Sequence, residues 1–299
     1  MIDIEYFDIR FDNENSLYYA GNYLKGTLDL VIKNRTKVTS LKLVLTGKGE
    51  TIWSVFAGET PIAQYDSEEY LRKEQIILSS DKKKDLFLDP GNYTYKFEIP
   101  LPSNLPSSFK NSIGKINYEI EAIIDRPLSL KKHVIKSFTV FSHMDLSMQP
   151  NLKEVCKVND PKIVLSTGLR SHFIIADFRI NKGGYVPFEK IEFDVNLENK
   201  SNRELKEMSV CLVQCFKSFK GAFVENKVIT SVNYSNRIND NSKQKWTAAI
   251  IVPVVCPSSA EICKIMEIKY QVVLKLTVSG ISTTKNMEIP ITIGTHPVN

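Results

Sequence analysis

Alternation of apolar and polar residues is the dominant pattern along the chain. It is clearest over residues 191–198, where Ile191, Phe193, Val195 and Leu197 alternate with carboxylate or amide side chains. The same pattern recurs in residues 28–32, 41–45, 93–99, 116–124 and 266–278. A sheet with one solvated face requires this period of two. The pattern therefore predicts half-buried antiparallel strands.

Short turn-forming clusters separate these strands. They occupy residues 12–15, 89–92, 181–184 and 199–202 and are rich in Asn, Asp, Gly and Pro. Residues 67–80 carry many charges and fit neither the strand nor the helix template, so they are left unassigned. Many short strands with such turns predict β-sandwiches.

An internal repeat indicates how many sandwiches there are. Two prolines and a Pro-Ser-Ser sequence recur after 151 residues: Pro102, Pro106, Ser107 and Ser108 match Pro253, Pro257, Ser258 and Ser259. About a dozen residues later, Tyr118 and Tyr270 each enter an alternating strand, and residues 28–34 match residues 193–199 at a second offset. The repeat predicts one sandwich over residues 1–145, a hinge over 146–160 and a second sandwich over 161–299.

Composition and charge exclude several classes of protein. The 299 residues are 42% hydrophobic and 24% charged, which is typical of a globular protein. The net charge of +5 is too small for a nucleic-acid-binding footprint, so no nucleic-acid partner is expected. The sequence shows neither a signal peptide nor a membrane-spanning apolar run, and the five cysteines suit reduced, packed thiols. We therefore expect a cytoplasmic protein and interpret its four glycosylation sequons, at Asn34, Asn92, Asn199 and Asn233, as accidental.

No constellation of residues indicates catalysis or metal binding. The four histidines are scattered, and neither a nucleophile elbow nor a phosphate-binding loop is present. Cys211 and Cys215 would lie about 13 Å apart along one strand, too far to share a metal. We therefore expect that the protein is not an enzyme and that it has no catalytic residues, no cofactor and no metal site.

Two basic clusters are the candidate contact residues. One comprises Lys82, Lys83 and Lys84 in an expected loop, and the other comprises Arg126, Lys131, Lys132 and Lys136 beside an expected strand. Such charges commonly form a solvated rim that keeps sheet edges apart. The functional alternative is contact with an anionic membrane surface or an acidic cargo segment.

The ordered landmarks of the sequence resemble the alpha-arrestins, the arrestin-domain-containing branch of the arrestin superfamily. The landmarks are GNYLKG (21–26), GKGETIW (47–53), FEIPLPSNLPSSF (97–109), INYEIEAIIDRP (116–127), GYVPFEKIEF (184–193) and IPITIG (289–294). The resemblance spans nearly the whole chain. It implies an all-β fold of two tandem arrestin-type, immunoglobulin-like antiparallel sandwiches in a bilobed arrangement.

The resemblance also implies a function. Alpha-arrestins are non-enzymatic cytosolic adaptors that bind membrane-protein cargo, receptors or transporters, and couple it to ubiquitylation, endocytosis and endosomal protein sorting at the plasma membrane and endosomes. They recruit HECT-type ubiquitin ligases through Pro-Pro-x-Tyr motifs, whereas these 299 residues contain no Pro-Pro pair. The sequence also has Phe188 where the family more often has glycine, which makes the geometry of that turn an open question.

Two other functions remain as alternatives. A retromer-like coat subunit in endosomal transport would share the fold without needing a ligase-binding motif. An extracellular tandem-sandwich binding module would account for the four sequons.

Overall fold

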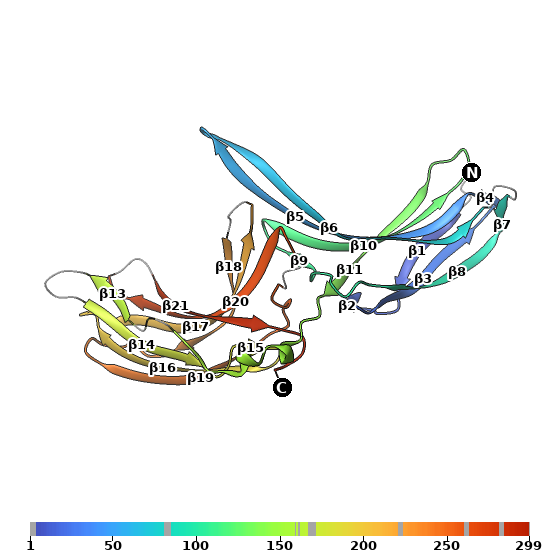
Figure 1. Ribbon diagram of the computed structural model, residues 1–299. Coiled ribbons are helices and arrows are strands. Elements are labelled where there is room, and N and C mark those ends of the chain that lie inside the picture. The colour runs from blue at the N-terminus through green and yellow to red at the C-terminus, as the bar shows by residue number, and fades with distance from the viewer. Residues whose placement is uncertain are drawn as a thin grey trace. The chain divides into compact units, whose positions relative to one another are not determined.

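The computed structural model describes residues 4–80, 85–158, 160, 162–166, 172–220, 224–259, 263–280 and 284–298 (Figure 1). The chain divides into two compact units. The first comprises Met1–His143 with Ser218–Gly221 and Ala260–Met266, and the second comprises Met144–Lys217, Ala222–Ser259 and Glu267–Asn299. Strands dominate both units, and the helical turns of the described residues are the short 3₁₀ segments η1 (Leu146–Met148) and η2 (Pro150–Lys153). The predicted all-β class is confirmed.

The described residues of the first unit form three sheets. Its strands are β1 (Ile4–Phe11), β2 (Leu17–Tyr19), β3 (Tyr23–Ile32), β4 (Thr36–Val38), β5 (Ser40–Ala57), β6 (Thr60–Ser79), β7 (Leu86–Leu88), β8 (Gly91–Pro100), β9 (Phe109–Lys110), β10 (Gly114–Asp125) and β11 (Lys132–Phe141). One sheet has the order β1-β3-β8, and the larger one has the order β2-β11-β10-β5-β6, with β9 also paired to β10. Strands β4 and β7 form a separate pair.

In the second unit, the part of the chain that the structure describes forms two five-stranded sheets. Its strands are β12 (Cys156–Lys157), β13 (Lys162–Ser166), β14 (His172–Ile180), β15 (Gly184–Tyr185), β16 (Lys190–Lys200), β17 (Leu205–Ser218), β18 (Val224–Tyr234), β19 (Lys243–Ile251), β20 (Met266–Val278) and β21 (Lys285–Ile293). One sheet has the order β12-β14-β16-β19, with β13 paired to β14, and the other has the order β15-β21-β20-β17-β18.

The two units repeat one topology. The order β1-β3-β8 corresponds to β14-β16-β19, and β2-β11-β10-β5-β6 corresponds to β15-β21-β20-β17-β18. In each unit the short strand between the first two long strands pairs in parallel with the last strand, β2 with β11 and β15 with β21. This shared departure from antiparallel pairing supports the internal repeat inferred from the sequence.

The repeated Pro-Ser-Ser segments make the same hydrogen bonds in both units. Ser108 donates its backbone N–H to Val140 O (2.7 Å), and its Oγ accepts the backbone N–H of Val140 (2.9 Å). Ser258, which the sequence repeat aligns with Ser107, forms the same reciprocal pair with Ile293, at 2.8 and 2.9 Å, so the bonds are equivalent one residue out of register with the repeat. In each unit one serine of the Pro-Ser-Ser segment therefore attaches its loop to the last strand, the second serine in the first unit and the first serine in the second.

Alternation places apolar side chains in the interior of each unit. In the first, the rings of Phe11, Tyr18 and Phe138 meet edge to face, with centroids 6.0–6.1 Å apart. In the second, Trp246 packs edge to face on Phe193 at 5.0 Å. The largest fully buried side chains are Ile9, Leu24, Leu28, Leu30, Leu41, Leu43, Tyr118, Phe178, Tyr185, Phe193, Phe216 and Tyr270.

The segment that sequence patterns left unassigned, residues 67–80, falls largely within β6. Its register with β5 shifts where Leu71 faces Gly47 and Glu69 faces Lys48, so Tyr70 is an extra residue in β6. The less exposed positions are consequently even-numbered from residue 66 to Tyr70 and odd-numbered from Leu71 to residue 77. A β-bulge therefore interrupts the period of two and explains why neither template fitted.

Phe188, which stands where alpha-arrestins more often have glycine, lies in a turn of unusual backbone geometry. Pro187 occupies the second position, Phe188 has φ +73°, and Glu189 donates its backbone N–H to Val186 O at 3.2 Å. This is the pattern of a type II turn, whose third position favours glycine because φ is positive there. The Phe188 side chain is 74% exposed and makes the turn strained.

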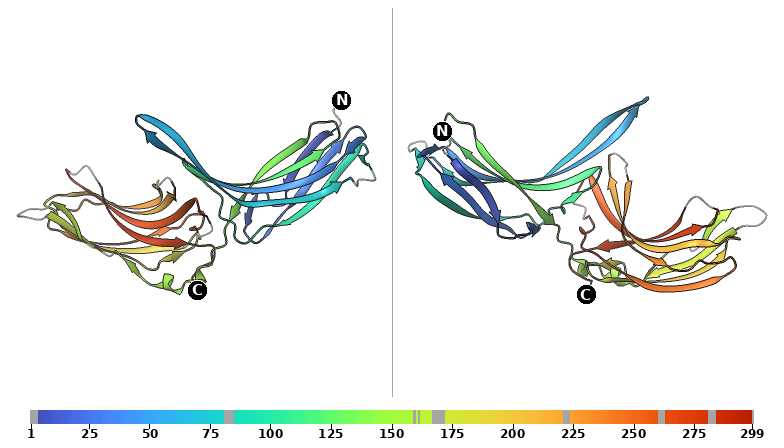
Figure 2. Two further views of the ribbon diagram at one scale, coloured as in Figure 1. Left: turned by 45° about the horizontal axis from the view of Figure 1, so that its top comes forward. Right: turned by 180° about the vertical axis from the view of Figure 1, so that it is seen from behind.

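Strands β5 and β6 continue beyond the rest of their sheet. The pairing of β5 with β10 ends at Thr51, whereas its pairing with β6 continues to Ala57 and Thr60. Figure 2 shows this two-stranded extension from two sides. Isolated two-stranded ribbons are at best marginally stable in water, so the extension is a candidate for contact with a partner.

Candidate binding surface

The second basic cluster lies at the turn between β10 and β11 and along β11. Its members are Arg126, Lys131, Lys132 and Lys136. Lys131 Nζ lies 3.2 Å from Asp125 Oδ2, and Arg126 Nη2 donates to Leu130 O at 3.3 Å. Both contacts are local, and the Lys131 side chain remains 62% exposed. Lys131 is therefore well placed to meet an anionic partner.

The other two lysines contact β1 instead. Lys132 Nζ donates to Ile4 O at 3.0 Å, and Lys136 Nζ pairs with Asp8 Oδ2 at 2.9 Å. The structure thus divides the cluster into a pair at the turn, of which Lys131 is exposed and Arg126 is half-buried, and a pair that also fastens β11 to β1. Contact of all four with an anionic partner stays a prediction. Lys82, Lys83 and Lys84 lie outside the described residues.

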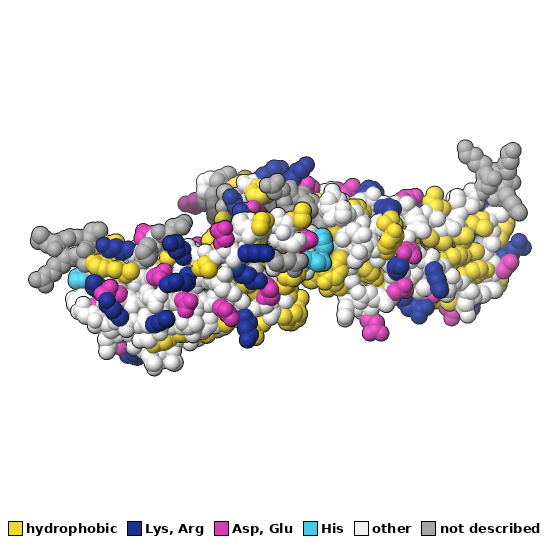
Figure 3. All heavy atoms as spheres, turned by 60° about the horizontal axis from the view of Figure 1, so that its bottom comes forward, with side chains coloured by type: hydrophobic (Ala, Val, Ile, Leu, Met, Phe, Trp, Pro, Cys, Tyr) yellow, Lys and Arg dark blue, Asp and Glu magenta, His cyan; other side chains and the backbone are white. Residues whose placement is uncertain are grey.

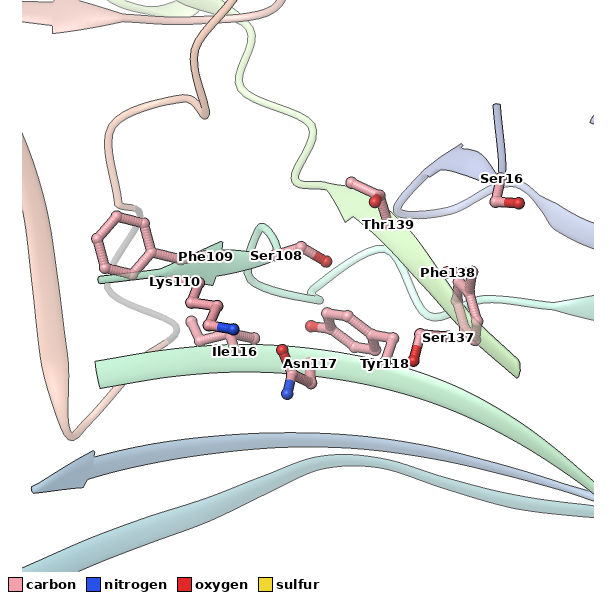
Figure 4. A pocket seen from close by; sticks show the side chains of 10 residues that line it. All are labelled: Ser16, Ser108, Phe109, Lys110, Ile116, Asn117, Tyr118, Ser137, Phe138 and Thr139. Carbon is pink, nitrogen blue, oxygen red and sulfur yellow. The ribbon is translucent and has the colours of Figure 1, made fainter. Parts of the chain in front are cut away.

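A hollow of about 370 Å³ opens where β11 diverges from β10 and β9 takes its place (Figure 4). Its lining is rich in hydroxyl groups and comprises Ser16, Ser108, Phe109, Lys110, Ile116, Asn117, Tyr118, Ser137, Phe138 and Thr139. Lys110 is the only ionisable side chain in this lining apart from Tyr118, so no carboxylate or histidine is present. The hollow has groups that could bind a small polar molecule but no nucleophile paired with a general base.

The tyrosine in this hollow is committed to the fold. The Tyr118 hydroxyl donates to Pro106 O at 2.7 Å, and burial raises the pKa of the phenol above its ordinary value. Gly47 makes room for the ring, since a Cβ at that position would overlap it. Tyr118 therefore anchors the Pro-rich loop and is not available as a proton donor or acceptor near neutral pH.

The β5–β6 extension presents exposed apolar side chains. Ile52 is 41% exposed, Ile62 is 44% exposed and Tyr65 is 73% exposed. Along residues 52–65 the only ionisable group with a formal charge at neutral pH is Glu59. Strand β6 is also an edge of its sheet, so its outer side has backbone groups that no neighbouring strand of that sheet pairs. These features suit protein binding.

Sequence reasoning missed two side chains in the turn between β10 and β11. Leu128 and Leu130 are fully or nearly fully exposed, at 107% and 90%. The available signal was an apolar pair, separated by one serine, inside a turn between two alternating strands. Only the structure shows that no described residue of the first unit covers these leucines.

Charges of both signs are interspersed on the molecular face shown in Figure 3. The described residues contain no cluster of three or more His, Cys, Asp or Glu side chains suited to a metal ion. All five cysteines are free thiols. No helix in the described part of the chain is long and apolar enough to cross a membrane.

Comparison with known proteins accounts for the repeated topology. Residues 7–147 match the arrestin (or S-antigen) N-terminal domain, and residues 171–298 match the corresponding C-terminal domain. Arrestin domain-containing protein 17 of Caenorhabditis elegans is 27% identical over 99% of this chain and 72% of its own length. Arrestin domain-containing protein 4 of Mus musculus is 25% identical over 96% and 70%, respectively. Thioredoxin-interacting protein of Homo sapiens is 24% identical over 98% and 75%. With an N-terminal and a C-terminal arrestin domain over most of its length and with these relatives, the chain belongs to the alpha-arrestin family of arrestin domain-containing proteins.

Proposed function

We propose that this protein is a non-enzymatic adaptor that binds membrane-protein cargo and couples it to ubiquitylation, endocytosis and endosomal sorting. The observation that carries the proposal is the pair of arrestin domains, N-terminal and then C-terminal, which together span most of the chain. The repeated sandwiches provide rigid sheets with exposed edges and loops, which are surfaces for binding rather than turnover. The protein would act in the cytoplasm, with peripheral association to the plasma membrane and endosomes.

The β5–β6 extension is the cargo-contact surface we propose to test first. It combines exposed apolar side chains, a low density of charge and a sheet edge that no other described strand of that sheet pairs. Recruitment of a HECT-type ligase would have to use a surface other than a Pro-Pro-x-Tyr motif of these residues, since they contain no such motif.

One sequon bears on the extracellular alternative. Asn199 is fully buried, and its Nδ2 donates to Arg203 O (2.8 Å) and lies 3.1 Å from Asn239 O. A glycan on that nitrogen would replace these contacts and would not fit inside the folded unit. The burial of Asn199 therefore removes one of the four sequons on which the extracellular alternative depends, while Asn92 and Asn233 are exposed.

Affinity capture of the tagged protein from its own cells, followed by mass spectrometry, tests the proposal. A variant with Ile62→Ser and Tyr65→Ser should lose membrane-protein partners. A control with Val224→Ser and Val228→Ser, which alters two exposed valines on β18, should retain them. Recovery of receptors or transporters with a ubiquitin ligase would support the adaptor. A stoichiometric coat complex would favour the retromer-like alternative, and absence of membrane, endosomal and ligase proteins would refute the proposal.

A further inference from the structure

The turn joining β10 to β11 presents two exposed leucines, one of which, Leu128, is in a strained conformation. Leu128 has φ +55°, with Pro127 before it, and Ser129 lies with its backbone N–H 3.4 Å from Arg126 O. Glycine or asparagine is usual at such a position, because a branched side chain is strained at positive φ. Leu128 is 107% exposed and Leu130 is 90% exposed, so neither side chain stabilises the first unit by burial. Two large apolar groups at a strained and exposed tip indicate a role outside the fold.

The turn is held in one geometry from both sides. Pairing of β10 with β11 continues to Ile124 and Lys132 at its base. Within the turn, Arg126 Nη2 donates to Leu130 O, and Lys131 pairs with Asp125. These contacts fix the leucines at the tip, with basic groups directly behind them.

We propose that residues 126–132, the leucine turn, insert Leu128 and Leu130 into the surface of an anionic lipid bilayer. The order of groups along the turn matches the layers of such a bilayer. The leucines at the tip would reach the acyl boundary, while Arg126, Lys131 and Lys132 would remain among the negatively charged headgroups. Asp125 is the one acidic residue in 125–136, and it is paired with Lys131. The net positive base of the turn favours a negatively charged membrane over an apolar pocket on a neutral protein surface.

The inference rests on the proposed function only in assuming that the protein works at a membrane. Insertion of the leucine turn would add a weak, direct lipid contact to cargo binding and would orient the first unit at the bilayer. A short loop with two leucines and three basic residues gives reversible association, because stable anchoring requires larger apolar groups or a second signal.

The chain contains a matched control for this turn. Phe188 also follows a proline, also has positive φ at +73° and is 74% exposed. Its turn is held differently, since the Glu189 carboxylate accepts hydrogen bonds from Lys182 Nζ (2.9 Å) and from the backbone N–H of Val186 (2.9 Å). Phe188 is therefore a strained, exposed apolar residue that lacks neighbours equivalent to Arg126, Lys131 and Lys132, and it can serve as the control.

The experiment is sedimentation of the full chain with vesicles of three parts phosphatidylcholine to one part phosphatidylserine, and with vesicles of phosphatidylcholine alone. The double variant Leu128→Ser, Leu130→Ser should bind the anionic vesicles at least tenfold more weakly, equivalent to about 1.4 kcal/mol. Phe188→Ser should bind like the unaltered protein. Lys131→Gln should weaken binding to anionic vesicles and reduce its sensitivity to salt, with little effect on neutral vesicles.

A second measurement reports insertion itself. Leu128→Trp should gain fluorescence that brominated lipids quench, in excess of the quenching seen for the native Trp53 and Trp246, whereas Phe188→Trp should gain fluorescence that they do not quench. Equal vesicle binding of the double-leucine variant and the unaltered protein, or an equal loss in Phe188→Ser, would overturn the proposal. Cargo capture in detergent, where no bilayer exists, separates the two proposals. If capture fails while the leucine variant still loses vesicle binding, the adaptor proposal falls and the lipid contact stands.

Discussion

The hydrogen bond from Ile293 to Ser258 provides a sensitive test of how the repeated motif stabilises the fold. Ile293 is fully buried, Ser258 is 7% exposed, and the backbone N–H of Ile293 donates to Ser258 Oγ at 2.9 Å. Ser258→Ala removes this acceptor and leaves the reverse bond, from Ser258 N–H to Ile293 O, in place. The substitution therefore leaves a buried N–H group without a partner while changing little else.

The cost of that unpaired group sets the expected magnitude. An unsatisfied buried donor destabilises a protein by about 1–3 kcal/mol, so we expect a loss of about 2 kcal/mol from the second unit. With an unfolding entropy of about 2.1 cal/mol/K per residue, a unit of about 145 residues would melt roughly 7 °C lower. The equivalent change in the first unit, Ser108→Ala, should cost less, about 1 kcal/mol, because Ser108 is half-buried and water can replace part of the lost bond.

Calorimetry and amide hydrogen exchange together measure the effect. Exchange at Ile293 should accelerate about thirtyfold in Ser258→Ala, which corresponds to 2 kcal/mol at about 1.4 kcal/mol per factor of ten. Ser231→Ala, which removes an exposed hydroxyl from the same unit, serves as the control and should change neither quantity. If Ser258→Ala melts within 1 °C of the unaltered protein and leaves exchange at Ile293 unchanged, the reciprocal bond has no role in attaching the loop.

Three further substitutions test other parts of the fold. Phe188→Gly should raise the free energy of unfolding by about 0.5–1 kcal/mol, because the relief of positive-φ strain exceeds the effect of the entropy that glycine adds to the unfolded chain. A loss of stability on denaturant titration would contradict this. Asn199→Ala should lower the free energy of unfolding by about 3 kcal/mol, since the carbonyls of Arg203 and Asn239 lose their donor. A melting temperature close to that of the unaltered protein would show that these hydrogen bonds do not stabilise the fold. Burial alone would raise the pKa of Asp29, but hydrogen bonds from Arg10 and Thr94 outweigh it and hold that pKa below its ordinary value. The Asp29 carboxylate therefore stabilises the fold above about pH 4 and loses this effect as pH falls through its folded pKa. Asp29→Asn should accordingly destabilise the protein at pH 7 but not at strongly acidic pH, and a pH-independent difference would show that charge is not the cause.

The sequence alone determined the regularly alternating strands and the repeat. Alternation is a local property: successive side chains of a strand point to opposite faces, so residues such as 191–198 reveal a half-buried strand without knowledge of its neighbours. The repeated Pro-Ser-Ser segments and the tyrosines Tyr118 and Tyr270 likewise marked two copies of one unit, and the structure shows that both tyrosines donate to a carbonyl of the preceding loop.

Only the tertiary structure decided which strands pair and what each side chain meets. Tyr70 forms a β-bulge because the pairing of β6 with β5 skips this residue. The resulting shift interrupts the period of two, so the alternation of apolar and polar residues did not predict β6. Lys136 meets Asp8 across 128 positions of sequence, and the sequence gives no sign of that contact, whereas Lys131 remains largely exposed. Leu128 could not be distinguished from a core leucine by its identity alone. Local alternation records the face of a strand on which a residue lies, but partners and exposure depend on distant segments that folding brings together.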